Sequence, residues 1–137
     1  MGDTANPDIV EHISPLGFRP TVAILTAAIA RSGMTLFAII DHAASAAEAG
    51  LLMPPTMVLI YGNPKGGTPV MLTTPSAALD LPLRVLVRED STLGVVVAFH
   101  PVTKMLERAG VDPVVAAKLE PAQQSLLGEL NAHKSGR

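Results

Sequence analysis

The sequence has 137 residues, of which 48% are hydrophobic, and its 10 basic and 12 acidic residues leave a formal net charge of −2. This length is typical of one domain with a substantial hydrophobic core. The sequence has no basic block and only 3% aromatic residues, which argues against nucleic-acid binding, because that function needs positive charge and stacking rings. The absence of Cys excludes disulfides, thiolate nucleophiles and Cys-ligated metal centres.

The first forty residues predict a loose tail over 1–7 and a strand over 9–13. A helix over 18–32 and a second strand over 34–40 are expected to follow. Apolar residues from Phe18 to Ile29 recur at the helical spacing, and Gly33 is a typical helix stop. Residues 34–40 are apolar on both faces, which predicts a strand in the centre of the sheet.

The apolar stretch from Thr21 to Ile40 is long enough to cross a bilayer, so a membrane helix has to be considered. Arg31 and Gly33 interrupt it, and a charge within a membrane span is expensive. A helix, a turn and a buried strand therefore explain the stretch better. The N-terminus has no basic and apolar leader, and Asn6 stands where a myristoylation signal needs Ser or Thr. We expect a cytoplasmic location.

The middle of the chain predicts a short helix over 43–50, a strand over 56–61, a glycine-rich loop over 61–68 and a connector over 75–82. Thr68 followed by Pro69 is typical of a helix N-cap and first turn, which predicts a short helix from Thr68 to Thr74.

The last third predicts a β-hairpin and two helical regions. The hairpin strands are expected at 83–88 and 93–99, around a turn at 89–92. Helices are expected at 101–108 and from Asp112 to about residue 132, with a kink at Pro121 and a frayed tail over 133–137. Without a linker or repeat, we expect one α+β domain over residues 8–132.

Several segments of this sequence occur together in a known family: Asp41-His42, the 61–68 segment, Leu81-Pro82-Leu83-Arg84, and the turn at Glu89-Asp90 with Gly94. Through them, about residues 8–130 resemble the bacterial and archaeal family called domain of unknown function 302. The resemblance implies a β-α-β(4)-α fold, an antiparallel sheet with helices packed on one face, like the TATA-binding protein in the broad sense. It implies no activity, and a fold alone does not supply one.

The glycine-rich loop is the first candidate site. The adjacent Gly66 and Gly67 permit positive φ and converging backbone N–H groups, and a helix starting at Thr68 would add its positive dipole end. With Asn63 and Lys65 nearby, these residues predict a site for a small anion such as a carboxylate or phosphate. The spacing is not that of a Walker A loop. A purely structural turn, with the Asn63 side chain bonded to nearby backbone, is the alternative.

Asp41 and His42 are the second candidate site. A carboxylate beside an imidazole at a strand end is typical of an acid–base pair, with Asp41 orienting His42. The alternative is that Asp41 caps the following helix. A metal site would need His42 with His100 or His12, but no metal-ligand spacing supports one.

These residues support two functions of different classes. The first is an accessory or binding module that holds an anionic small molecule between the 63–68 loop and His42. The second is a minimal enzyme with His42 as general base, Asp41 as its orienter and Lys65 balancing negative charge. A homo-oligomeric structural protein is a third. No cofactor is indicated, and the high apolar fraction predicts a homo-oligomer, most simply a dimer.

Overall fold

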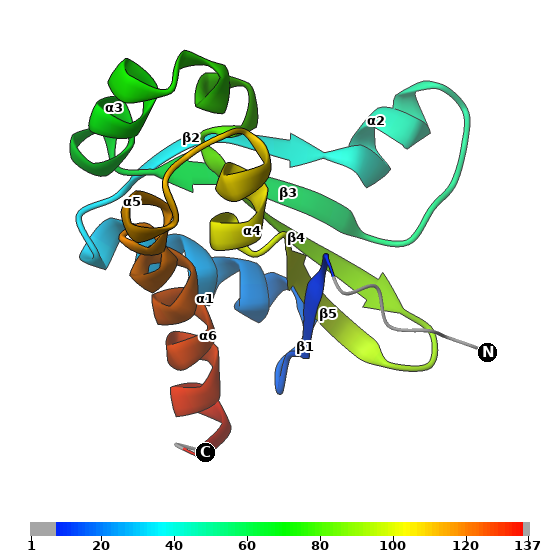
Figure 1. The fold of residues 1–137 in the computed structure, drawn as a ribbon. Helices are drawn as coiled ribbons and strands as arrows, with labels where there is room; N and C mark the ends of the chain where they lie inside the picture. The colour runs from blue at the N-terminus through cyan, green and yellow to red at the C-terminus, as the bar shows by residue number, and fades with distance from the viewer. Residues whose placement is uncertain (1–7, 136–137) are drawn as a thin grey trace.

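The computed structural model describes residues 8–135, which form a five-stranded antiparallel sheet with helices packed against it (Figure 1). The strand order across the sheet is β1-β5-β4-β3-β2. The strands are β1 (Val10–Ile13), β2 (Thr35–Asp41), β3 (Thr56–Gly62), β4 (Leu83–Asp90) and β5 (Gly94–Phe99). The helices are α1 (Phe18–Arg31), α2 (His42–Glu48), α3 (Pro64–Thr73), the 3-10 helix η1 (Pro75–Asp80), α4 (Val102–Arg108), α5 (Pro113–Ala117) and α6 (Glu120–Ser135).

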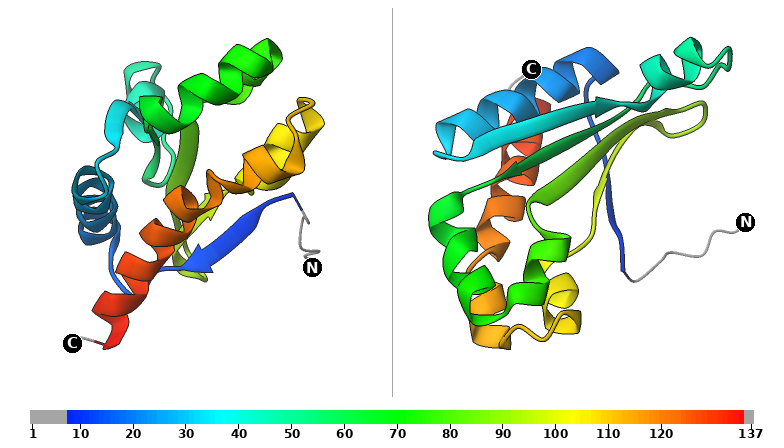
Figure 2. Two further views of the ribbon diagram at one scale, coloured as in Figure 1. Left: turned by 60° about the vertical axis from the view of Figure 1, so that its left-hand side comes forward. Right: turned by 90° about the horizontal axis from the view of Figure 1, so that it is seen from above.

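The hydrophobic core lies between one face of the sheet and the helices α1 and α6, which pack beside each other (Figure 2). Period-two alternation in β4 explains which face is buried: Leu83, Val85 and Val87 point into the core, and Arg84 is exposed between them. The apolar stripe of α1 meets this face through Leu25, which is fully buried. The expected α+β sheet is thus confirmed.

A buried amide joins the last helix to α4. The side chain of Gln123 accepts a hydrogen bond from the Val102 backbone N–H (2.9 Å) and donates one to the His100 carbonyl oxygen (2.8 Å). The Val102 N–H lies at the start of α4, where a helix has no internal acceptor for it. Gln123 therefore supplies from α6 the capping interaction that Pro101, which precedes the helix, does not make.

Three expectations about the elements are wrong. The second strand, β2, lies at the edge of the sheet rather than its centre. Consequently Phe37, Ala38 and Ile39 are exposed, and Leu36 and Ile40 are only half-buried. Helix α3 begins at Pro64, four residues before Thr68. The C-terminal region is broken into α5 and α6 before Pro121, and α6 continues to Ser135, so residues 133–135 are helical rather than a tail.

The predicted tails at 1–7 and 136–137 lie outside the described residues. Within residues 8–135, no helix combines the length and apolar character that a bilayer crossing requires. The stretch 21–40 is divided between α1 and β2, and Gly33 makes the turn between them with a φ of 74°. A positive φ of this size strains residues that carry a Cβ atom, which explains why glycine occupies the turn.

Candidate functional site

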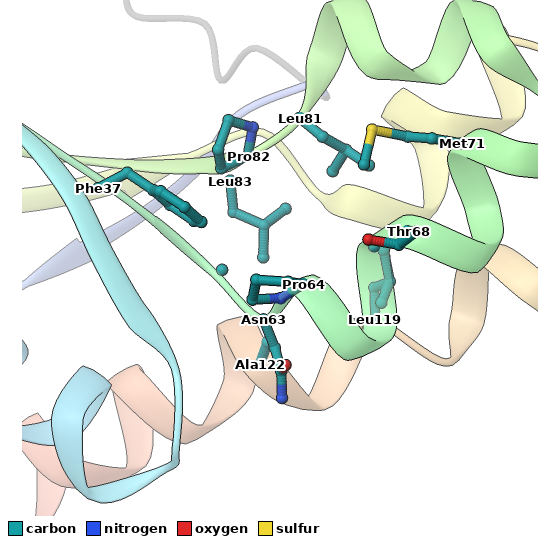
Figure 3. Close-up of a pocket in the computed structure, with 12 residues that line it drawn as sticks. Phe37, Asn63, Pro64, Thr68, Met71, Leu81, Pro82, Leu83, Leu119 and Ala122 are labelled. Atoms are coloured by element: carbon teal, nitrogen blue, oxygen red, sulfur yellow. The ribbon is translucent and has the colours of Figure 1, made fainter.

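A pocket of about 360 Å³ lies where β3 ends and α3 begins (Figure 3). We call it the β3 pocket. Its walls come from the end of β3, from α3, from the segment leading into β4 and from the start of α6. One side chain of β2, that of Phe37, also lines it. The lining residues are Phe37, Gly62, Asn63, Pro64, Gly67, Thr68, Met71, Leu81, Pro82, Leu83, Leu119 and Ala122.

The absence of a side chain at Gly62 helps to keep the pocket open. A Cβ atom there would lie 3.6 Å from Cβ of Pro82 and 3.9 Å from Cε2 of Phe37, so these two side chains flank the strand end at contact distance. Phe37 reaches this position because the pairing of β2 with β3 shifts register between Leu36 and Ala38, leaving Phe37 in a β-bulge. Bulges commonly re-aim a side chain in this way.

The first turn of α3 is closed to an anion by its own backbone. Pro64 has no N–H, and the Lys65 N–H donates to the Asn63 side-chain oxygen (2.9 Å). The N–H groups of Gly66 and Gly67 both donate to the Asn63 carbonyl oxygen (2.9 Å each). Neither glycine has a positive φ. The expected glycine-rich loop with converging free N–H groups is therefore wrong, and these residues form a capped helix.

Only some of the predicted ligand-binding residues line the β3 pocket. Asn63, Gly67 and Thr68 line the β3 pocket, and Figure 3 shows the Thr68 hydroxyl turned toward its interior. Lys65 and Gly66 belong to the same helical turn but do not line the pocket. The pocket wall is thus almost wholly apolar, with Thr68 and Asn63 as its polar side chains.

Asp41 and His42 lie at the other end of the sheet. The Asp41 carboxylate accepts a hydrogen bond from the Ala44 N–H (2.9 Å) and caps α2, as the structural alternative predicted. In the pairing of β2 with β3, Asp41 lies opposite Met57. At the other end of β2, Thr35 lies opposite Gly62. The strand rise therefore separates Asp41 from Gly62, in the β3 wall of the pocket, by about 20 Å. A single site shared by His42 and Lys65 is not formed, and acid–base chemistry at Asp41-His42 alone stays a prediction.

Metal-ligating clusters and buried polar side chains are two other possible components of a site. Among residues 8–135, no group of three or more His, Asp or Glu side chains is placed to hold a metal ion. The Tyr61 hydroxyl is buried without a hydrogen-bond partner in the described part of the chain, and burial raises the pKa of this phenol above its ordinary value. Tyr61 packs in the core and does not line the β3 pocket.

Sequence reasoning missed most of the apolar pocket wall. The segment Leu81-Pro82-Leu83 carried a signal, because it occurs together with the 61–68 segment in the family that the sequence resembles. The structure brings the two together, with the Leu81–Pro82 peptide bond in the cis form. Phe37, Leu119 and Ala122 lack such a signal, because apolar residues on strands and helices are ordinarily read as core.

The fold and the pocket define an α+β domain with a ligand-sized apolar pocket at one end of an antiparallel sheet. Residues 10–130 match the family described as "Domain of unknown function DUF302", and the chain belongs to this family. A crystal structure of an uncharacterized conserved DUF302 protein from Bacillus stearothermophilus superposes with a TM-score of 0.79 at 16% identity, covering 92% of this chain and 98% of that one. That likeness establishes the fold.

Among curated proteins, a stretch of 72 residues is 43% identical to "Fluoride-specific ion channel FluC 1" of Brucella suis and to the protein of the same name from Brucella abortus. The stretch is 53% of this chain but only 28% and 27% of those proteins. The chain therefore corresponds to a minor part of the curated relatives that it matches.

Proposed function

We propose that this domain is a binding module that holds a small apolar or amphipathic molecule in the β3 pocket. The observation that carries the proposal is the pocket itself: its volume of about 360 Å³ lies within the range of small-molecule sites, and its walls are apolar with few polar groups. Polar groups of this kind orient a ligand, whereas the apolar wall supplies most of the binding free energy.

The pocket wall favours a ligand with an apolar body. The backbone donors of the first α3 turn are already used by Asn63, so a compact anion would find no free N–H group among them. Thr68 offers one hydroxyl inside the pocket. Lys65 is exposed in the first turn of α3, and its flexible stem would allow it to pair with an acidic head group at the surface. A monocarboxylate with a hydrocarbon or aromatic body fits both features.

The Brucella relatives support an accessory role for such a module. In proteins named fluoride-specific ion channels, the segment related to this chain makes up little more than a quarter of the length. The remainder of those proteins lies outside the matched stretch. We propose that this domain senses a small molecule on behalf of a larger transport protein, either fused to it or associated with it. Fluoride is a poor candidate for the ligand itself, because the β3 pocket is apolar.

Titration with a series of monocarboxylates of increasing chain length, followed by amide chemical shifts, tests the proposal. We expect saturable shifts centred on Gly67, Thr68 and Met71, with affinity rising with chain length because each buried methylene contributes about 0.8 kcal/mol. Gly67→Leu would place a side chain beside Leu81 and Met71 and should weaken binding by roughly tenfold or more.

The matched control is Gly128→Leu. This glycine lies in α6 with nothing within 4 Å of a built Cβ atom, so the same substitution there should leave binding unchanged. Absence of saturable shifts with every member of the series would reject the proposed function. Equal binding by the two variants would reject the β3 pocket as the site.

A further inference from the structure

The outer edge of β2 is an apolar strand without a partner. Within residues 8–135, no strand pairs with its outer side. Its sequence, TLFAIID, carries no charge before Asp41, and the side chains of Phe37 and Ile39 are 50% and 52% exposed. An edge of this kind is a template for pairing with another strand, and proteins usually protect such edges with charges or by shortening them.

The opposite edge of the sheet shows that protection. Strand β1 has only four residues and carries Glu11, whose carboxylate pairs with the guanidinium of Arg88 at 3.4 Å. A short strand with a charged side chain is a poor template for a further strand. The two edges therefore differ in chemistry, and β2 is the one suited to an interface.

A second apolar feature follows β2 directly. Residues 42–55, which we call the arm, comprise α2 and the segment leading into β3, and they extend beyond the end of the sheet (Figure 1). None of the residues His42–Glu48 is buried by the described part of the chain. Beyond α2, three consecutive apolar residues, Leu51, Leu52 and Met53, are exposed, and Leu52 is 97% exposed. A cluster of this kind on a projecting segment is typical of an interaction surface.

We infer that two copies of this chain pair through β2, in antiparallel orientation, so that the arm of each copy covers the mouth of the β3 pocket of the other. The regular part of β2 begins after the bulge, at Ala38. Pairing centred between Ile39 and Ile40 places Ala38 of one copy opposite Asp41 of its partner. The partner's arm then starts beside Phe37, which lines the pocket.

The second copy is the occupant because the two apolar features complement each other only between molecules. Within one chain, the length of β2 separates the start of the arm from Gly62, in the β3 wall of the pocket, by about 20 Å. An antiparallel neighbour reverses that direction and brings its own arm to the pocket end, where Thr35 is level with Gly62. A two-fold interface repeats this contact twice with one set of residues, as isologous interfaces do.

The mass of the protein in solution tests the pairing. We expect a dimer by sedimentation equilibrium, and Ile39→Lys should raise the dimer dissociation constant by roughly tenfold or more, because it places a charge at the centre of the interface. Leu79→Lys is the matched control, since Leu79 lies in η1, is grouped with Arg84 and His100 around a different hollow of the surface, and is 85% exposed. Circular dichroism checks that both variants are folded.

A monomeric wild-type protein, or a dimer that Ile39→Lys and Leu79→Lys affect equally, would overturn the inference. If the purified protein were found with its β2 edge paired to a different protein instead of a second copy, the inference would also be overturned. The mass is measured without a ligand, so failure of the pairing is distinguished from failure of the proposed binding function.

The placement of the arm is tested by cross-linking between copies. The chain has no Cys, so single cysteines introduced at chosen positions are unique. We expect a short bis-maleimide to link Leu52→Cys to Thr68→Cys when the two variants are mixed. Leu79→Cys mixed with Thr68→Cys should give no such product. If the first pair yields no more linked dimer than the control pair, the arm does not cover the partner's pocket.

Discussion

The helical conformation of the Gly66-Gly67 pair can be tested by the sign of a stability change. Gly67 lies in α3 with an ordinary negative φ, so Gly67→Ala should stabilise the protein by about 1 kcal/mol through the higher helix propensity of alanine. The new methyl group would lie 3.9 Å from Cδ1 of Leu81 and 4.0 Å from Cε of Met71, which are ordinary contacts. Urea unfolding should then shift its midpoint upward by about 0.5 M.

Two other glycines make the result interpretable. Gly66→Ala should gain much less, because its Cβ would lie 3.2 Å from Cδ2 of Leu119, which must move. Gly33→Ala should cost roughly 1 kcal/mol, since Gly33 has a φ of 74° and nothing within 4 Å of its Cβ position. If Gly67→Ala destabilises the protein as Gly33→Ala does, residues 66–67 form a strained turn and our reasoning about α3 is refuted.

Two further predictions concern buried polar groups. Gln123→Leu should destabilise the protein by about 2 kcal/mol, because it leaves the buried Val102 N–H without an acceptor. Urea unfolding measures this change. As a control, Gln124→Leu on the exposed side of α6 should change the stability little. Tyr61→Phe should leave stability at neutral pH unchanged or raised by up to about 1 kcal/mol, since the hydroxyl has no partner in the described chain. Burial raises the phenol pKa in the folded state, so the wild type should lose stability as pH rises above about 10, the unfolded value, and the Phe variant should lack this component. A parallel pH dependence of the two proteins would show that Tyr61 is not protected from ionisation.

Much of the fold could be predicted because the local signals agree with the tertiary structure. The helical spacing of apolar residues predicted α1, with its stop at Gly33, and the two apolar segments around the turn at 89–92 predicted the hairpin of β4 and β5. The position of β2 could not be predicted by the same reasoning. A strand that is apolar on both faces is ordinarily central. That β2 lies at the edge follows only from the sheet topology, in which β2 has β3 as its single neighbour within residues 8–135.

The candidate site was harder to predict because its residues come together from distant segments. Thr68 followed by Pro69 is a good helix-start signal, but Asn63 followed by Pro64 is an equally good one and lies earlier. The helix begins at the earlier signal, and this removes the free backbone donors on which the anion site depended. The pocket wall contributed by Leu119 and Ala122 depends on how α6 and the turn before it pack, which no local pattern reports.

The pairing of β1 with β5 has a consequence for the order in which the chain can fold. Val10 is level with Phe99, so the first strand of this sheet in chain order pairs with the last. Strands β2 to β4 pair with sequence neighbours and can associate earlier, since closing a short loop costs less entropy. During translation, β1 cannot form its hydrogen bonds with β5 until β5 has emerged from the ribosome. The N-terminal strand is therefore expected to be accessible to chaperones for longer than any other strand of the sheet.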